Sequence, residues 1–126
     1  MNPKTQEIIN NNLREYFMLG TKVNNLKIER SANLEHEIAK SIIYCCLRYE
    51  GREIVVNGKL KNGQIPDLFV VDLINPIIYE IGHSEEEIRE TKEYPCLVKF
   101  IKTKDKRIHK KNYPFKKIEV KCTTQS

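Results

Sequence analysis

The sequence lacks any apolar run long enough to cross a membrane. No eighteen consecutive residues are apolar, and about that many are needed to span a bilayer as a helix. The first residues, Met-Asn-Pro-Lys-Thr-Gln-Glu, are polar and lead into no apolar segment of the kind found in a secretory leader. These absences predict a protein that has no membrane partner and is located in the cytoplasm.

Cysteine is sparse and is not arranged for metal binding. The four cysteines, at positions 45, 46, 96 and 122, form no Cys-x-x-Cys pair, and no histidine cluster lies beside them. Structural zinc sites are built from such pairs, so a zinc site is not expected. We expect these cysteines to be small thiols that are buried or half-buried.

Internal repeats and low-complexity linkers are absent as well. A chain of 126 residues with 40% hydrophobic and 31% charged content has the size and composition of one ordinary globular domain. We expect a single domain over 1–126. It consists of a helix over 5–19, a core over about 31–103 and a basic C-terminal extension over 102–126.

Positive charge is unevenly distributed along the chain. The segment 99–121 has ten Lys or Arg and two acidic residues, whereas the remaining chain has twelve basic and fifteen acidic residues. A basic segment attached to an acidic body is typical of a protein that binds a polyanion, most often nucleic acid. A solvated lysine-rich surface explains the same charge, so both interpretations stay open. The residues that would contact nucleic acid are Lys102, Lys104, Lys106, Arg107, Lys110 and Lys111, with Lys59 and Lys61 in the loop 58–63.

Hydrophobic periodicity and the positions of Gly and Pro divide the chain into helices and strands. Helical spacing predicts one helix over 5–19 and a second from Ser31 or Asn33 to about Tyr49. Ser84 and Glu87 form a capping box that opens a third helix, ending near residue 94. Runs rich in Val, Ile, Leu and Phe predict strands over 53–57, 66–73, 77–81, 97–103 and 117–122.

This order of elements predicts a mixed sheet. The first three strands form an antiparallel meander, and the third and fourth, joined through a helix, run parallel with a right-handed crossover. The middle strands are apolar on both faces, which implies helices on both sides of the sheet. The expected fold class is therefore α/β, as a three-layer α/β/α sandwich.

The second helix carries an apolar stripe that we expect to face the sheet. On a helical wheel Glu35 falls inside this stripe, whereas His36, Glu37 and Lys40 fall outside it, toward solvent. Glu35 is thus the helix acid expected to point at the sheet. Around the wheel the stripe runs from Leu34 through Cys45, Ile38, Tyr49, Ile42 and Cys46 to Ala39.

Two further acids interrupt the apolar strands. With a four-residue turn at 73–76, Asp72 pairs with Ile77 and Asp67 faces Gly82, which places Asp67 and Glu80 diagonally on one face of the sheet. A carboxylate inside Ile-Ile-Tyr-Glu-Ile is costly to bury unless it is paired or bound to metal. Together with Glu35, these acids predict a three-carboxylate site for a divalent cation. Separate structural roles, as a strand cap, an edge salt bridge and a helix-border acid, are the alternative.

These three acids and their surroundings resemble the PD-(D/E)xK nuclease superfamily, whose small members include archaeal Holliday-junction resolvases and restriction-type endonucleases. Leu-Glu-His-Glu-Ile-Ala-Lys at 34–40 resembles the helix that supplies the family's first acid. Ile-Pro-Asp at 65–67 resembles its P-D motif, and Tyr-Glu-Ile-Gly-His-Ser at 79–84 its E-x-K motif. The family's core order, αβββαβ, is similar to the order expected over about 31–103. The first helix and the basic extension lie outside the match.

The resemblance implies a restriction-endonuclease-like fold and Mg²⁺- or Mn²⁺-dependent hydrolysis of phosphodiester bonds in DNA, including structured or branched DNA. It implies that Glu35, Asp67 and Glu80 hold the metal, which would activate water and stabilise charge on the phosphate. The departure is Gly82, which stands where the family usually has Lys. Lys99, a charge inside Val-Lys-Phe-Ile, is the first candidate for the catalytic role of that lysine.

Two other function classes stay open beside the nuclease. A nuclease fold that lost catalysis with Gly82 would act as a nucleic-acid-binding module. An assembly protein would use the N-terminal helix or an edge strand to form a homodimer.

Overall fold

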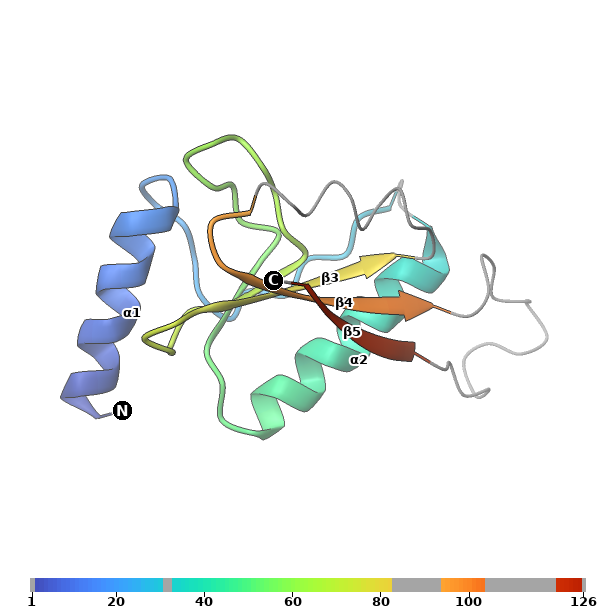
Figure 1. Ribbon diagram of the computed structural model, residues 1–126, viewed down its shortest axis with the longest axis horizontal. Helices are drawn as coiled ribbons and strands as arrows, with labels where there is room; N and C mark the ends of the chain where they lie inside the picture. The colour runs from blue at the N-terminus through green and yellow to red at the C-terminus, as the bar shows by residue number, and fades with distance from the viewer. Residues whose placement is uncertain (1, 31–32, 83–93, 104–119, 126) are drawn as a thin grey trace.

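The computed structural model describes residues 2–30, 33–82, 94–103 and 120–125, in which two helices and five strands are found (Figure 1). The helices are α1 (Pro3–Tyr16) and α2 (Leu34–Tyr49). The strands are β1 (Ile54–Val56), β2 (Leu68–Val70), β3 (Ile77–Gly82), β4 (Leu97–Thr103) and β5 (Val120–Gln125).

The ends of α1 follow from local sequence. Asn2 caps the helix by accepting a hydrogen bond of 2.8 Å from the backbone N–H of Lys4. Pro3 occupies the first turn, where a missing N–H breaks no helical bond. The chain becomes extended at Phe17, so the predicted helix is present but ends earlier than expected.

Asn33 is the residue that caps α2. Its side-chain oxygen accepts hydrogen bonds from the backbone N–H groups of Glu35 and His36. At the other end, Gly51 takes a φ of +88° and donates its N–H to the carbonyl of Arg48 over 2.9 Å. Glycine adopts this left-handed conformation without the steric cost that a side chain adds, so the helix ends here.

The sheet has the order β1-β2-β3-β4-β5. β1, β2 and β3 form an antiparallel meander, and β3 and β4 run parallel, so both predictions about strand direction are confirmed. β5 pairs antiparallel with β4 and overlaps the predicted strand over 117–122, whose first three residues lie outside the described residues. The described residues therefore form a small α/β fold around a mixed sheet.

Alternation along the strands creates one hydrophobic cluster on each face of the sheet. Ile9 of α1 and Phe17 pack into the first cluster, and Ala39 and Leu47 of α2 pack into the second. The first cluster contains Val55, Leu60, Phe69, Val71, Ile78 and Val98, and the second contains Ile54, Val56, Leu68, Val70, Ile81 and Ile101.

The apolar stripe predicted to bury α2 faces away from the sheet. Leu34 is 52% exposed, Ile42 39% and Tyr49 95%, and Cys45 and Cys46 are exposed rather than buried. The side that packs on the sheet carries Ala39, at the border of the predicted stripe, together with Ile43 and Leu47, which the stripe did not include. The error has a simple cause: α2 is apolar on two sides, and helical periodicity alone does not say which side meets the sheet.

Part of the predicted architecture falls outside the described residues. The third helix was predicted over 84–94, and nothing in the described residues places it. The three-layer sandwich with an αβββαβ core therefore stays a prediction. Among the described helices, none is both long enough and apolar enough to cross a membrane.

Candidate functional site

The connection between β2 and β3 is longer than the sequence predicted. Val70 pairs with Ile77, so the loop spans 71–76 and the predicted pairing of Asp72 with Ile77 is wrong. The residues after Val70 do not continue the pairing with β3. Their carbonyl groups at positions 71 and 73 instead accept hydrogen bonds of 2.9 and 2.8 Å from the side-chain amide of Asn12. The register differs from the predicted one by two residues. Each side chain therefore keeps its face of the sheet.

Asp67 and Glu80 are in contact just beyond the last residue pair between β2 and β3. The backbone N–H of Asp67 donates a hydrogen bond of 2.7 Å to Oε1 of Glu80. The backbone N–H of Ile81 donates one of 2.9 Å to Oδ2 of Asp67. Asp67 lies beside Glu80, whereas the predicted register placed it opposite Gly82. Where β2 begins, the Asp67 carboxylate thus accepts a backbone hydrogen bond from β3 that a carbonyl group of a paired strand would otherwise accept.

The carboxyl group of Glu80 is held in a state that favours a proton. Burial, the largest cause, and the nearby negative charge of Asp67 together raise its pKa to about 8, against the opposing effects of hydrogen bonds from the Asp67 backbone and from Tyr94 and of the charge of His36. Two acids in this arrangement repel each other when both are ionised. A proton or a cation between them relieves that repulsion.

His36 lies beside this pair, although the helical wheel predicted that it faces solvent. Its Nε2 is 3.2 Å from Oδ2 of Asp67, and its Nδ1 is 2.8 Å from Oε2 of Glu37. The hydrogen bond with Asp67 raises the pKa of His36 to about 9, against the opposing effect of burial and with the support of both carboxylates. The imidazolium therefore bridges two acids.

Glu37 and Lys40 were also predicted to face solvent, and both are buried. Lys40 is 0% exposed and Glu37 is 3% exposed. The ammonium of Lys40 donates to Oε1 of Glu37 over 2.8 Å and to Oδ1 of Asn57 over 2.7 Å. Burial raises the pKa of Glu37, but hydrogen bonds from Lys40, the Glu29 backbone and His36 outweigh it and lower the pKa below its ordinary value. A polar network thus connects α2 to the end of β1.

Glu35 is buried, as predicted, but it is not part of this network. Glu35 is only 3% exposed. Both of its carboxylate oxygens are buried without a hydrogen-bond partner among the described residues. A buried acid without partners is costly. The orphaned oxygens of Glu35 are therefore the feature of the described residues that most clearly calls for a ligand.

The metal-binding capacity of these acids can be judged from their positions. No three or more His, Cys, Asp or Glu side chains in the described part of the chain are grouped closely enough to hold a metal ion between them. Mg²⁺ does not need such a cage, because it commonly takes one or two carboxylates and fills its other positions with waters and substrate phosphates. Asp67 and Glu80 provide the two carboxylates that such a site needs.

The position expected to hold a lysine is Gly82 at the end of β3, where it pairs with Lys102. Lys99 was the first candidate to replace it. Its Nζ lies 5.8 Å from the centre of the Tyr79 ring. Adjacent residues of a strand point to opposite faces, so Lys99 over Tyr79 is on the other face from Glu80. The described residues thus do not bring Lys99 to the acidic pair.

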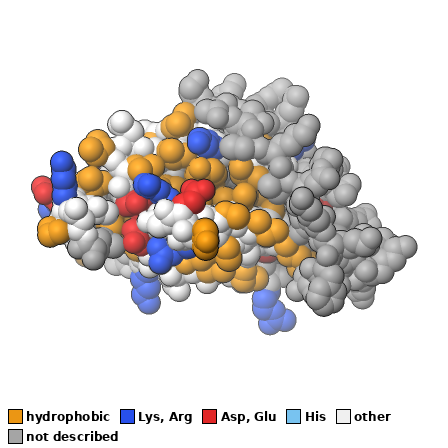
Figure 2. All heavy atoms as spheres, turned by 90° about the horizontal axis from the view of Figure 1, so that it is seen from below, with side chains coloured by type: hydrophobic (Ala, Val, Ile, Leu, Met, Phe, Trp, Pro, Cys, Tyr) orange, Lys and Arg blue, Asp and Glu red, His pale blue; other side chains and the backbone are white. Residues whose placement is uncertain are grey.

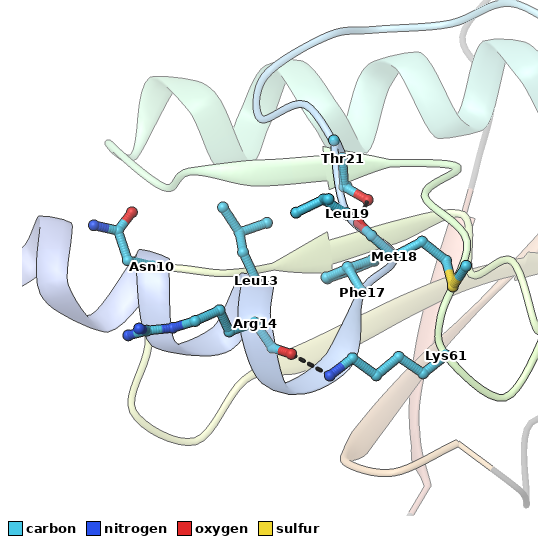
Figure 3. A pocket seen from close by; sticks show the side chains of 9 residues that line it. Asn10, Leu13, Arg14, Phe17, Met18, Leu19, Thr21 and Lys61 are labelled. Carbon is cyan, nitrogen blue, oxygen red and sulfur yellow. Dashed lines mark hydrogen bonds between the residues drawn. The ribbon is translucent and has the colours of Figure 1, made fainter.

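A hollow of about 570 Å³ lies beside the end of α1 and shares no residue with the candidate site (Figure 3). Lys61 lines it and donates from Nζ to the backbone carbonyl of Arg14, so this lysine ties the loop 58–63 to α1. Lys59 and Lys102 are exposed and free to meet a polyanion at the surface. The other basic residues predicted to bind nucleic acid, Lys104, Lys106, Arg107, Lys110 and Lys111, lie outside the described residues.

The residues that the sequence argument missed are His36, Glu37, Lys40 and Asn57. A signal for two of them was present, because Ala39, Ile43 and Leu47 form a second apolar arc of α2 that includes positions 36 and 40. No comparable signal marked Asn57. It follows a short buried strand and takes a positive φ of 48°.

Comparison with known proteins adds no assignment. No family model, no curated protein and no solved structure matches this chain. The function is therefore inferred from the geometry of the site.

Proposed function

We propose that this protein is a metal-dependent nuclease that hydrolyses phosphodiester bonds in DNA, with Mg²⁺ or Mn²⁺ as its cofactor. The observation that carries the proposal is the contact between Asp67 and Glu80 at the start of β2. Asp67 also contacts His36 in the first turn of α2. His36 follows Glu35, whose carboxylate has no hydrogen-bond partner among the described residues, and this gives further support. The proposal includes the restriction-endonuclease-like three-layer fold and the resemblance to the PD-(D/E)xK superfamily.

The residues of the chain have separate roles in this proposal. Asp67 and Glu80 would hold the cation, with Glu35 as a third oxygen donor. A bound divalent cation supplies charge stabilisation at the phosphate and lowers the pKa of water. The hydrogen bond from the Asp67 backbone fixes the Glu80 carboxylate, and the bond from Ile81 fixes that of Asp67. His36, in contact with Asp67, would add positive charge to a site that lacks the family's lysine.

The proposed substrate is DNA, reached through the basic surface. Lys59 and Lys102 are exposed, and the segment 104–111 adds five basic residues. Structured or branched DNA and a homodimeric assembly are further parts of the proposal, as is a cytoplasmic location. Phosphate contacts release counterions, so binding should weaken linearly on a logarithmic salt scale.

A cleavage assay tests the proposal. The protein is incubated with Mg²⁺ or Mn²⁺ against plasmid, single-stranded DNA and a four-way junction. We expect slow cleavage that EDTA stops and that Asp67→Ala and Glu80→Ala abolish. Glu50→Ala, which removes an exposed acid at the end of α2, is the matched control and should cleave like wild type. Absence of metal-dependent cleavage on every substrate would contradict the enzyme assignment.

Gly82 favours a second candidate, a nuclease fold that binds nucleic acid without cleaving it. General acid–base help from a positioned side chain contributes about 10²–10⁴ in rate, and Lys99 does not lie where it could supply that help. Gly82→Lys separates the candidates. If the wild type is inactive but binds DNA, and the folded Gly82→Lys variant cleaves it, the native protein is the binding module.

A further inference from the structure

The side of α2 that faces away from the sheet is apolar along the whole helix. Leu34 near its start and Tyr49 at its end are 52% and 95% exposed, and Ile42 between them is 39% exposed. Seen from below in Figure 2, hydrophobic side chains gather in a broad band on the face where α2 lies in Figure 1. We name this surface the outer stripe of α2; it consists of Leu34, Ile38, Ile42, Cys45 and Tyr49.

The composition of the outer stripe is unlike that of an ordinary surface helix. At 100° per residue its five members fall within about 80° of the helical wheel, and no charged residue lies among them. The charged residues of the helix lie outside this arc, and Glu35, Glu37 and Lys40 are buried. A helix that is apolar on opposite sides is normally covered on both, and exposed apolar patches mark interaction sites. Among the described parts of the chain, the sheet covers one side of α2, and Leu34, Ile42 and Tyr49 on the other side are exposed.

The spacing of the outer stripe fits a second copy of the same helix. The intervals along it are four, four, three and four residues, a pattern that reads nearly the same in both directions. We propose that α2 packs antiparallel on α2 of a second copy of this chain, about a two-fold axis near Ile42. Leu34 then meets Tyr49 of the second copy, and Ile38 meets its Cys45. Antiparallel packing also places opposite ends of the two helix dipoles together, and a two-fold interface needs such self-complementarity.

The size of the surface sets the strength of this contact. A helix of 16 residues is about 24 Å long at 1.5 Å per residue. A contact of that length between two helices reaches about the 1,000 Å² of total buried area at which specific interfaces begin. We therefore expect a weak dimer that dissociates on dilution. The outer stripe lies on the opposite side of α2 from His36 and Lys40, so the dimer leaves the acidic site uncovered and does not depend on the proposed nuclease activity.

Sedimentation of the full-length protein tests the interface. Wild type should shift from monomer to dimer between low and high micromolar concentration, in reducing buffer. Ile42→Glu places two carboxylates against each other at the axis and should raise the dimer dissociation constant at least about tenfold. Ile74→Glu makes the same change at an isoleucine that is 74% exposed in the loop 71–76, and should leave dimerisation unchanged.

Folding of the variants is checked by their thermal midpoints in dilute solution, where the protein is monomeric. Because Ile42 is already exposed, Ile42→Glu should leave the monomer's midpoint close to that of wild type. A wild type that stays monomeric at high concentration would overturn the proposal, as would a dimer unaffected by Ile42→Glu. A monomeric wild type that Ile42→Glu strongly destabilises would show that another part of this chain covers the stripe.

Disulfide trapping tests the antiparallel orientation. Two Cys45 residues would be seven positions apart along the paired helices, about 10 Å, beyond the roughly 7 Å between Cα atoms that a disulfide spans. Oxidised wild type should therefore stay uncrosslinked. In a Cys45→Ser, Cys46→Ser background, Ile42→Cys should form a covalent dimer across the axis, and Ile74→Cys should not. Crosslinking of wild type through Cys45 would indicate parallel helices and overturn the antiparallel arrangement.

Discussion

The backbone N–H of Asp67 donates a hydrogen bond of 2.7 Å to Oε1 of Glu80, which holds two acids of neighbouring strands side by side. The same contact places the negative charge of Asp67 where it raises the pKa of Glu80. The arrangement is unfavourable for two free carboxylates and favourable for two carboxylates that share a cation. The first two predictions follow from this contact.

Divalent cations should stabilise the folded protein independently of any cleavage. A ligand that binds the folded state alone raises the thermal midpoint as its concentration rises. We expect Mg²⁺ and Mn²⁺ to raise the midpoint of wild type at neutral to alkaline pH, and Asp67→Asn and Glu80→Gln to remove the rise. Differential scanning fluorimetry measures it. Asp72→Asn, which breaks the ion pair with Arg52, is the control and should retain the rise. A rise of equal size in the two site variants would place the cation elsewhere.

Glu80 should make the metal-free protein less stable as pH rises. Its folded pKa of about 8 lies above the ordinary value of 4.5, so the folded state binds more protons between these values and the free energy of unfolding falls with rising pH. Glu80→Gln mimics the protonated acid and should flatten this fall, with a gain on the order of 1–3 kcal/mol near pH 8. Urea midpoints across the pH range in EDTA measure the effect. A variant that loses stability in parallel with wild type would contradict the role of Glu80.

His36 should contribute to the same fall at higher pH. Its folded pKa of about 9 lies above the ordinary 6.5, so the stability from its contacts with Asp67 and Glu37 is fully present below pH 6.5 and is lost as pH rises through about 9. His36→Gln, measured in the Glu80→Gln background, should remove the remaining pH dependence in this window. A slope that persists in the double variant would assign it to other groups.

Lys40 should matter for stability because it is fully buried. Lys40→Met keeps most of the side-chain volume but leaves Glu37 with one hydrogen-bonded cation fewer, and we expect a loss of about 3 kcal/mol. Lys59→Met at an exposed position should change stability by less than about 0.5 kcal/mol. The double variant Lys40→Met, Glu37→Gln should recover part of the loss, because the unpaired charge is removed. Urea unfolding at neutral pH measures all four proteins.

Glu35 should be a residue whose removal stabilises the metal-free protein. Its buried oxygens have no partner among the described residues, so Glu35→Leu should raise the free energy of unfolding by about 1–3 kcal/mol in EDTA. The same variant should lose metal-dependent cleavage if Glu35 is a ligand. Glu7→Leu, an exposed acid of α1, is the matched control and should be nearly neutral. A destabilised Glu35→Leu variant would mean that the carboxylate has a structural partner.

Local features of the fold could be predicted from the sequence, and the reason is that short-range interactions determine them. Ser31 or Asn33 before an apolar-periodic run and Gly51 after it gave the position of α2 to within two residues at its start. Alternating or continuous runs of Val, Ile and Phe gave β1 to β4, and the helix-length segment between 82 and 97 predicted that β3 and β4 run parallel. The proximity of Asp67 and Glu80 could also be predicted, because a register error of two residues preserves the face of each side chain.

Only the tertiary structure decided which side of α2 meets the sheet. The sequence offers two apolar arcs, one through Leu34 and Tyr49 and one through Ile43 and Leu47, and the predicted stripe followed the first, reaching the buried side only at Ala39. In the structure Asn57 and Asp67 lie at the end of the sheet and supply partners for Lys40 and His36. The buried side of α2 is therefore the side whose polar residues, His36 and Lys40, find hydrogen-bond partners on the sheet. Those partners lie 17 and 31 residues away along the chain, and helical periodicity within α2 carries no information about them.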